Sequence, residues 1–124
     1  MNATENAWPT EIRLAKDRRT LTVSFDTGES FDLPAEQLRV LSPSAEVQGH
    51  SPEQRQTVPG KRNVEIISIE PIGNYAVRLT FDDLHDTGLF SWPYLLKLGR
   101  NGDALFAEYE AELAAKGLSR DPKI

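Results

Sequence analysis

The sequence predicts a small α+β domain with about five antiparallel strands, a short helix between two β groups and a C-terminal helix. Three observations support this fold class. Apolar and polar residues alternate over residues 11–33 and again over residues 64–81. A polar segment at 42–63 separates these two stretches. Near the C-terminus, apolar residues recur at the four-residue spacing of a helix with one buried face.

The first β group lies in "EIRLAKDRRTLTVSFDTGESFDLP". Alternation of β-branched and aromatic residues with polar ones is typical of strands that bury one face. The polar stretches "KDRR" and "DTGE" separate the runs, and Gly28 in the second stretch can adopt a positive φ without strain. We therefore expect a three-stranded antiparallel meander. Its apolar positions are Ile12, Leu14, Leu21, Val23, Phe25, Phe31 and Leu33.

A short helix is predicted in "PAEQLRVL", with Pro34 in its first turn, where a missing N–H costs nothing. Pro43 ends this helix. The 22 residues at 42–63 contain three Pro, two Gly and three Gln, but only three aliphatic side chains. Because they bury too little surface to offset the entropy lost on ordering, we expect much of this loop to be mobile.

The second β group is "VEIISIEPIGNYAVRLTF". Ile66 and Ile67 are adjacent, which is expected for a strand covered on both faces or for one that contains a bulge. Gly73 and Asn74 supply a turn. After this turn Tyr75, Val77, Leu79 and Phe81 alternate with polar or small residues, which predicts a second strand.

Two helical pieces are predicted in the last third of the chain. Ser91 can cap a helical turn that begins at "WPYLL". Asp103 can cap a second helix through "ALFAEYEAELAAKG", which ends near Gly117. This second helix carries an apolar stripe and is the best candidate to cover the sheet. The stripe consists of Leu105, Phe106, Tyr109 and Leu113.

These elements divide the chain into an ordered part with flanking segments. We expect a flexible N-terminus at 1–10, an ordered domain at 11–99 that contains the mobile loop 42–63, a C-terminal helical extension at 100–117, and a frayed tail at 118–124.

Composition excludes several classes of function. The chain has 124 residues and a formal charge of −5, which argues against nucleic acid or anionic membrane as the principal partner. It has no cysteine, so disulfides, thiolate nucleophiles and cysteine-based zinc or iron–sulfur sites are excluded. The N-terminus does not resemble a secretion signal, and no apolar run is long enough to cross a bilayer. We expect a cytoplasmic protein.

The segment "FDDLHDTGLFSWPYLLKLG" concentrates chemically active side chains, with three aspartates around His85. Imidazole and carboxylate are common metal ligands, so this cluster could form half of a metal site. The alternative is that His85 hydrogen-bonds to the chain and that the aspartates are solvated turn residues. The second interpretation is favoured, because nothing in the sequence supplies the remaining ligands.

The stretches "LPAEQLRVLSPSAEV" and "HDTGLFSWPYL" resemble the domain found at the N-terminus of gamma-butyrobetaine hydroxylases. The resemblance covers about residues 11–99. This domain also occurs as a stand-alone bacterial protein of unknown function and fused to Mrp-type iron–sulfur carrier ATPases in chloroplasts. The resemblance therefore implies an accessory domain and not a complete hydroxylase.

The resemblance also implies a lost zinc site. In the hydroxylases three cysteines and one histidine bind structural zinc, and their positions fall here on Ser42, Ser44, Val47 and His85. Serine is a poor zinc ligand and valine is none, so this set is vestigial and no metal or other cofactor is expected. A different metal could use Glu46, His50 and His85, although nothing in the sequence fixes their distances.

We interpret the chain as a non-catalytic binding or adaptor domain, because the iron–2-oxoglutarate facial triad of the hydroxylases is absent. The candidate partner-binding residues are Leu89, Phe90, Trp92 and Tyr94, although burial in the core is the commoner fate of such side chains. By resemblance, the partner could be a protein of iron–sulfur assembly. Two alternatives stay open: a metal-dependent protein built on His85, and a homodimerisation module.

Overall fold

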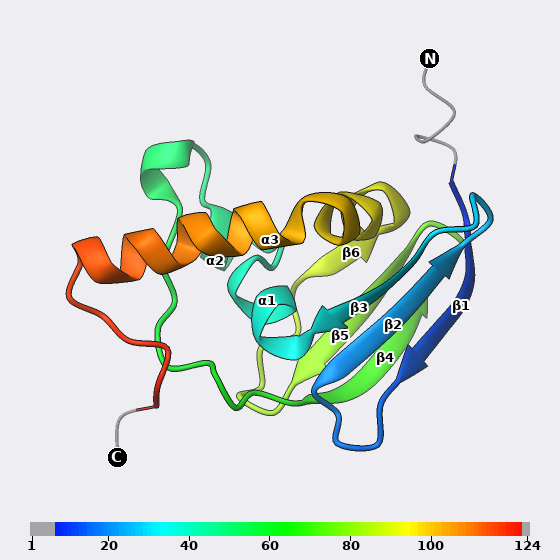
Figure 1. The fold of residues 1–124 in the computed structure, drawn as a ribbon, viewed down its shortest axis with the longest axis horizontal. Helices are drawn as coiled ribbons and strands as arrows, with labels where there is room; N and C mark the ends of the chain where they lie inside the picture. The colour runs from blue at the N-terminus through cyan, green and yellow to red at the C-terminus, as the bar shows by residue number, and fades with distance from the viewer. Residues whose placement is uncertain (1–6, 123–124) are drawn as a thin grey trace.

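The computed structural model describes residues 7–122 and shows two three-stranded antiparallel sheets, short helices and one long helix (Figure 1). This is the α+β class that the sequence predicts. The first sheet has the order β1-β2-β3, with β1 at Pro9–Leu14, β2 at Thr20–Phe25 and β3 at Ser30–Pro34. The second has the order β4-β5-β6, with β4 at Ile66–Ile72, β5 at Ala76–Phe81 and β6 at Leu89–Ser91.

The first sheet is the predicted meander. Along β2 the apolar residues Leu21 and Val23 are completely buried, while Thr22 between them is part-exposed and donates a hydrogen bond to Asp32 on β3. Gly28, in the turn between β2 and β3, has a φ of +91°, which a residue with a Cβ rarely adopts. Alternation and turn chemistry therefore sufficed to predict this sheet.

The second sheet contains one strand more than expected. A bulge between Ile66 and Ser68 puts Ile66 in the core and leaves Ile67 43% exposed, which explains the two adjacent isoleucines. The unpredicted strand is β6, which pairs with β5. With three residues, β6 is too short to show alternation in the sequence.

Helix α3 is a single helix at Trp92–Ala115, where the sequence suggested two. Ser91 caps it as predicted, accepting a hydrogen bond from the Tyr94 N–H at 3.3 Å. Asp103 lies inside the helix and caps nothing, so that expectation was wrong. No helix within residues 7–122 combines the length and the apolarity needed to span a bilayer.

Both sheets and the helices share one core. Helix α1, at Ala35–Val40, begins directly after Pro34, which is its N-cap residue and not part of its first turn. Figure 1 shows α3 lying across α1, and α3 also contacts β3 and β6. Tyr109 and Leu113 of α3 are buried in this core, so the last helix covers the sheets as predicted.

The segment 42–63 carries more structure than its composition suggests. It contains α2 at Ala45–Gln48 and the one-turn 3₁₀ helix η2 at Pro52–Gln54. Backbone N–H groups of Gly60 and Arg62 donate to the carbonyls of Ser119 and Arg120, at 2.9 and 3.0 Å. These bonds hold the described part of the tail, which was expected to fray, against the loop.

The expected flexible N-terminus at 1–10 lies largely outside the described residues. Of its last four residues, Ala7 is buried and Pro9 opens β1. Residues 123–124 of the expected tail also lie outside the described part. The ordered structure therefore begins before residue 11 on the N-terminal side and extends past residue 117 on the C-terminal side.

Replacing Gly99 by Ala tests the close approach of α3 to the first sheet. A Cβ at Gly99 would overlap the Phe31 ring of β3. We expect the free energy of unfolding to fall by about 1–3 kcal/mol, the usual cost of overpacking. The matched control is Asn101→Ala on an exposed site of α3, which should hold or raise stability through helix propensity. If the two variants were equally stable in urea unfolding, the close packing of Gly99 against the Phe31 ring would be contradicted.

Candidate functional site

A cluster of two hydroxyls and one imidazole joins segments far apart in the sequence. Ser42 follows α1, Ser44 is the N-cap residue of α2, and His85 lies between β5 and β6. The His85 Nε2 atom is 3.0 Å from Ser42 Oγ and 3.3 Å from Ser44 Oγ. We call these three residues the Ser–His cluster. The structure thus brings together three of the four positions that the resemblance assigned to the lost zinc site.

The surrounding chain holds the Ser–His cluster tightly. Ser42 has no exposed surface, and its carbonyl accepts a hydrogen bond from the Gln48 side chain at 2.9 Å. A Cβ at Gly88 would overlap Ser42 Oγ, so glycine is needed at this close approach. The His85 carbonyl accepts from the Phe81 N–H at 3.0 Å, which anchors the loop that carries the imidazole. Both serines are therefore part of the packed interior, and His85 is partly buried beside them.

The fourth position, Val47, lies in α2 with an exposed fraction of 2%. Two hydroxyls, one imidazole and one isopropyl group do not fit the Cys3His zinc site, because valine offers no ligand atom and serine a weak one. Within residues 7–122, no three side chains of His, Cys, Asp or Glu gather in a group that could hold a metal ion.

In the described part of the chain, the alternative ligands Glu46 and His50 do not gather with His85 in one group. The Glu46 carboxylate accepts a hydrogen bond from the Thr87 hydroxyl, and this bond lowers the pKa of Glu46. The His50 backbone N–H donates to the Gln54 side chain at 2.8 Å, and His50 is exposed. Within residues 7–122, these two residues and His85 do not form a metal-binding group.

An ion-pair network lies beside the Ser–His cluster. The Asp83 carboxylate is 2.8 Å from Arg39 Nε and 2.7 Å from Lys61 Nζ, and it also accepts from the His85 N–H at 3.1 Å. Burial raises the pKa of Asp83, but the hydrogen bonds from Lys61, His85 and Arg39 outweigh it and lower that pKa to about 2. Asp83 therefore connects α1 and the 42–63 segment to the loop that carries His85.

The imidazole of His85 favours the neutral form. Burial lowers its pKa below the ordinary value of 6.5, and the positive charge of Arg39 acts in the same direction. The carboxylates of Glu46, Asp83 and Asp86 oppose this shift without reversing it. A neutral imidazole can share hydrogen bonds with the two serine hydroxyls, so its protonation state matches the geometry of the cluster.

A serine beside a neutral histidine is also the arrangement of a nucleophile and its general base. In this chain the arrangement is not accessible to substrate, because Ser42 is completely buried between Gly88 and α2. The geometry supports a structural role, in which hydrogen bonds join α1, α2 and the β5–β6 connection.

The predicted partner-binding residues separate into exposed and buried ones. Leu89 is 40% exposed, whereas Phe90 is completely buried in the core and so offers no surface to a partner. The prediction for Phe90 was wrong because alternate residues of β6 face opposite sides. Tyr94 is partly buried and donates its hydroxyl hydrogen to the Leu41 carbonyl. Trp92 is partly buried and donates its indole N–H to the Asn74 carbonyl at 2.8 Å.

Sequence reasoning missed two exposed aromatic residues near Trp92. Trp8 is 49% exposed and Tyr75 is 54% exposed, and with Trp92 and Pro93 they line a recess of about 230 Å³. We call these four residues the aromatic recess. The sequence pattern puts Trp8 in the loose N-terminus and Tyr75 on the inward face of a strand. The pairing of β6 with β5 brings Tyr75 next to Trp92, and the packing of the first sheet against the second brings Trp8 to the same recess.

Stability should fall as the pH is lowered from about 7 to about 5, because the unfolded chain binds a proton at His85 that the folded chain resists. The contribution of neutral His85 is complete above 6.5 and is lost as the pH falls from 6.5 through the lowered pKa of the folded state. Asp83 acts in a separate window, because its contribution is lost only as the pH falls from 3.8 towards about 2.

Urea unfolding at a series of pH values would measure this dependence. We expect His85→Gln to flatten the slope of the unfolding free energy against pH between about pH 7 and pH 5. The control His50→Gln changes the other histidine, which is exposed, and should preserve this slope. A slope that survives in His85→Gln would contradict the assignment.

Comparison with known proteins places this arrangement in a family. Residues 12–96 match the family described as gamma-butyrobetaine hydroxylase-like, N-terminal. No curated protein matches the chain. One similar NMR solution structure is 51% identical, with a TM-score of 0.81, and the match covers 95% of this chain and 93% of that one. A second NMR structure is 46% identical, with a TM-score of 0.82 and coverage of 100% and 92%.

A third similar structure is a crystal structure from Acidithiobacillus ferrooxidans of a protein of unknown function in the DUF971 family. It is 38% identical with a TM-score of 0.62, and the match covers 73% of this chain and 91% of that one. The agreement of sequence and fold extends over most of the chain. The chain belongs to the gamma-butyrobetaine hydroxylase-like N-terminal domain family.

Proposed function

We propose that this chain is a non-catalytic binding module that docks onto an apolar segment of another protein through the aromatic recess. The observation that carries the proposal is the half-exposed state of Trp8 and Tyr75 beside a recess walled by Trp92 and Pro93. Tryptophan and tyrosine are enriched among the residues that contribute most to binding energy in protein interfaces, and a cluster of exposed apolar side chains is more informative than a single one.

The walls of the aromatic recess are held in place before any partner arrives. The Trp92 indole is fixed by its hydrogen bond to the Asn74 carbonyl. Trp8 is fixed at its backbone, because its N–H donates to the Asp26 carboxylate at 3.1 Å and its carbonyl accepts from the Asp26 N–H at 2.8 Å. Rigid walls reduce the entropy lost on association, which favours binding.

The family resemblance and the composition support a proposal for the partner. The fusion of related domains to iron–sulfur carriers suggests a partner in iron–sulfur protein assembly, within the cytoplasm. The chain has no cysteine, so any cluster would be held by the partner. A second copy of the chain is the competing occupant, and it would make the module a homodimer.

Photo-crosslinking from position 75 tests the docking proposal. We expect p-benzoylphenylalanine at position 75 to capture one recurrent protein in the native cytoplasm, and the same group at exposed position 108 of α3 not to capture it. Purified, that protein should bind the wild-type chain and should bind Tyr75→Ala about tenfold or more weakly, as for an interface anchor.

Other outcomes would reject the docking proposal. Crosslinking only to a second copy, with a doubled mass in light scattering, would show a homodimer instead. Equal binding of the captured protein by Tyr75→Ala and wild type would show that the aromatic recess is not the interface. Circular dichroism should show that Tyr75→Ala stays folded, because the side chain is 54% exposed.

We further propose that the Ser–His cluster is a degenerate zinc site, in which hydrogen bonds replace the metal crosslink of related domains. The proposal is supported by the 3.0 and 3.3 Å distances that bring both serines to one imidazole nitrogen. If the backbone keeps the arrangement of a zinc site, restoring the thiolates should restore metal binding.

The triple variant Ser42→Cys, Ser44→Cys, Val47→Cys is expected to bind one Co²⁺ or Zn²⁺ ion per chain, and Co²⁺ should give thiolate-to-metal absorption bands. Adding His85→Gln should weaken this binding. The wild-type chain is the control and should show no such bands. Failure of the folded triple variant to bind either ion would contradict the degenerate-site proposal.

A further inference from the structure

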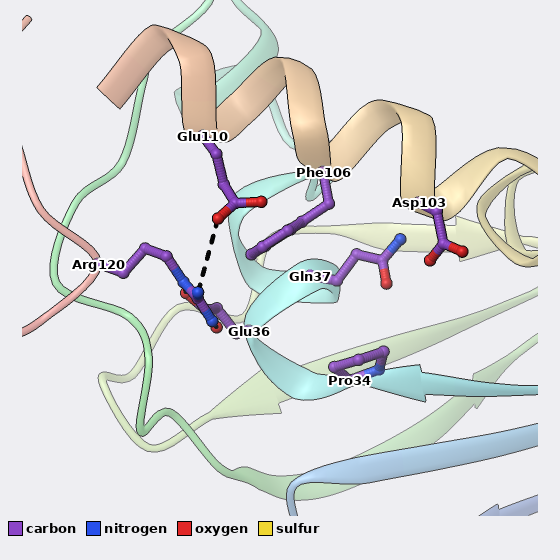
Figure 2. A pocket seen from close by; sticks show the side chains of 7 residues that line it. All are labelled: Pro34, Glu36, Gln37, Asp103, Phe106, Glu110 and Arg120. Atoms are coloured by element: carbon purple, nitrogen blue, oxygen red, sulfur yellow. Dashed lines mark hydrogen bonds and ion pairs between the residues drawn. The ribbon is translucent and has the colours of Figure 1, made fainter. Parts of the chain in front are cut away.

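A second pocket, of about 290 Å³, lies between α1, α3 and the C-terminal tail (Figure 2). Its charged lining consists of Glu36 from α1, Asp103 and Glu110 from α3, and Arg120 from the tail. The formal charge of this lining is negative, because three carboxylates face one guanidinium. None of these residues belongs to the aromatic recess or to the Ser–His cluster, so the pocket has no part in the function proposed above.

In the left part of this pocket in Figure 2, the positively charged side chain of Arg120 occupies the space. The Arg120 guanidinium donates two hydrogen bonds to the Glu36 carboxylate, both at 2.7 Å, and lies 3.7 Å from the Glu110 carboxylate. It also lies over the Phe106 ring, 5.1 Å from the ring centre. Two-pronged carboxylate contact and an aromatic face are the usual features of guanidinium recognition. The pocket thus recognises a cation within its own chain.

The other part of the pocket holds a polar group without a partner. Gln37 has an exposed fraction of 7%, and within residues 7–122 its side-chain amide has no hydrogen-bond partner, although the amide atoms are not among the fully buried ones. Figure 2 shows this amide and the Asp103 carboxylate on the same side of the Phe106 ring, away from Arg120. The hydrogen-bonding atoms of this amide are therefore open to a ligand that enters the pocket.

Helix α3 is shaped to accommodate the Gln37 amide. Gly102 of α3 is buried, and a Cβ at this position would overlap Gln37 Nε2. Glycine inside a helix costs about 1 kcal/mol relative to alanine. Here the glycine leaves room for the amide to reach the pocket.

We propose that this pocket binds a compact organic cation, a protonated amine or a guanidinium compound, between Gln37 and Asp103. The Asp103 carboxylate is exposed and makes no hydrogen bond with any residue in 7–122, so it is available to a cationic donor. The Gln37 carbonyl oxygen accepts a second hydrogen bond from the same cation, and Phe106 provides the apolar wall against which its carbon chain lies.

An anionic ligand fits this pocket less well. The single cation of the lining, Arg120, is already engaged by Glu36, and this pairing raises the pKa of Arg120. An anion would therefore lie near Asp103 and Glu110 without a free cation in the described lining to compensate them. Charge and hydrogen-bonding capacity both favour a positively charged ligand.

Titration with agmatine, which carries an ammonium and a guanidinium group, tests the proposal. In ¹H–¹⁵N correlation spectra at low salt, we expect saturable shifts of the Gln37 side-chain amide and of the Gly102 and Asp103 backbone amides. Asp103→Asn should weaken binding about tenfold or more, because a charge-assisted hydrogen bond is lost. The matched control Glu108→Gln removes the same charge from an exposed site of α3 outside the pocket and should bind like wild type.

A second variant separates binding from folding. Gly102→Ala should displace the Gln37 amide and weaken agmatine binding, while helix propensity holds or raises the unfolding temperature. Unchanged Gln37 shifts at saturating agmatine would overturn the proposal. Equal losses of agmatine affinity in Asp103→Asn and Glu108→Gln would also overturn it, because they would show general charge attraction. Preferential binding of glutarate would overturn it as well, because it would show an anion site. None of these outcomes bears on the aromatic recess.

Discussion

The close approach of α3 to the rest of the chain is the constraint on which this structure depends. Two glycines make it possible: Gly99 admits the Phe31 ring of β3, and Gly102 admits the Gln37 amide of α1. A side chain at position 99 would push against the Phe31 ring in the packed core, whereas one at position 102 would displace the end of the Gln37 side chain. The cost in helix propensity is offset by the burial of Tyr109 and Leu113 farther along the same face.

Both proposed binding regions follow from the course of α3. Its first turn supplies Trp92 and Pro93 to the aromatic recess, and its middle supplies Asp103, Phe106 and Glu110 to the cation pocket. Because one rigid helix contributes to both regions, their walls are held by the packing of the core. The tail after α3 adds Arg120, which shows within the chain how the pocket contacts a guanidinium.

In the degenerate-site proposal, the Ser–His cluster keeps by weaker interactions a crosslink that a metal makes in related domains. A zinc ion bound by four protein ligands contributes strongly to folding, whereas a single hydrogen bond contributes about 1 kcal/mol. Here two hydroxyls, the Asp83 ion pairs and the close packing of Gly88 act together on the loop that carries His85. The chain shares its fold with the gamma-butyrobetaine hydroxylase-like N-terminal domain family to which it belongs.

The sequence alone determined the elements whose signals are local. Alternation in β2 and β5, the turn at Gly28 and the apolar stripe near the C-terminus each depend on neighbours along the chain. The absence of cysteine likewise excludes a thiolate zinc site by composition alone, because no other side chain supplies that ligand atom.

Only the tertiary structure decided the features that join distant segments. The strand β6 forms by pairing with the edge of β5. Helix α3 contains Gly99 and Gly102 because the Phe31 ring and the Gln37 amide pack against its backbone there. The contact of Ser42 with His85 spans 43 positions, and that of Glu36 with Arg120 spans 84. Local patterns carry no information on such distances, because these are set by how the whole core packs.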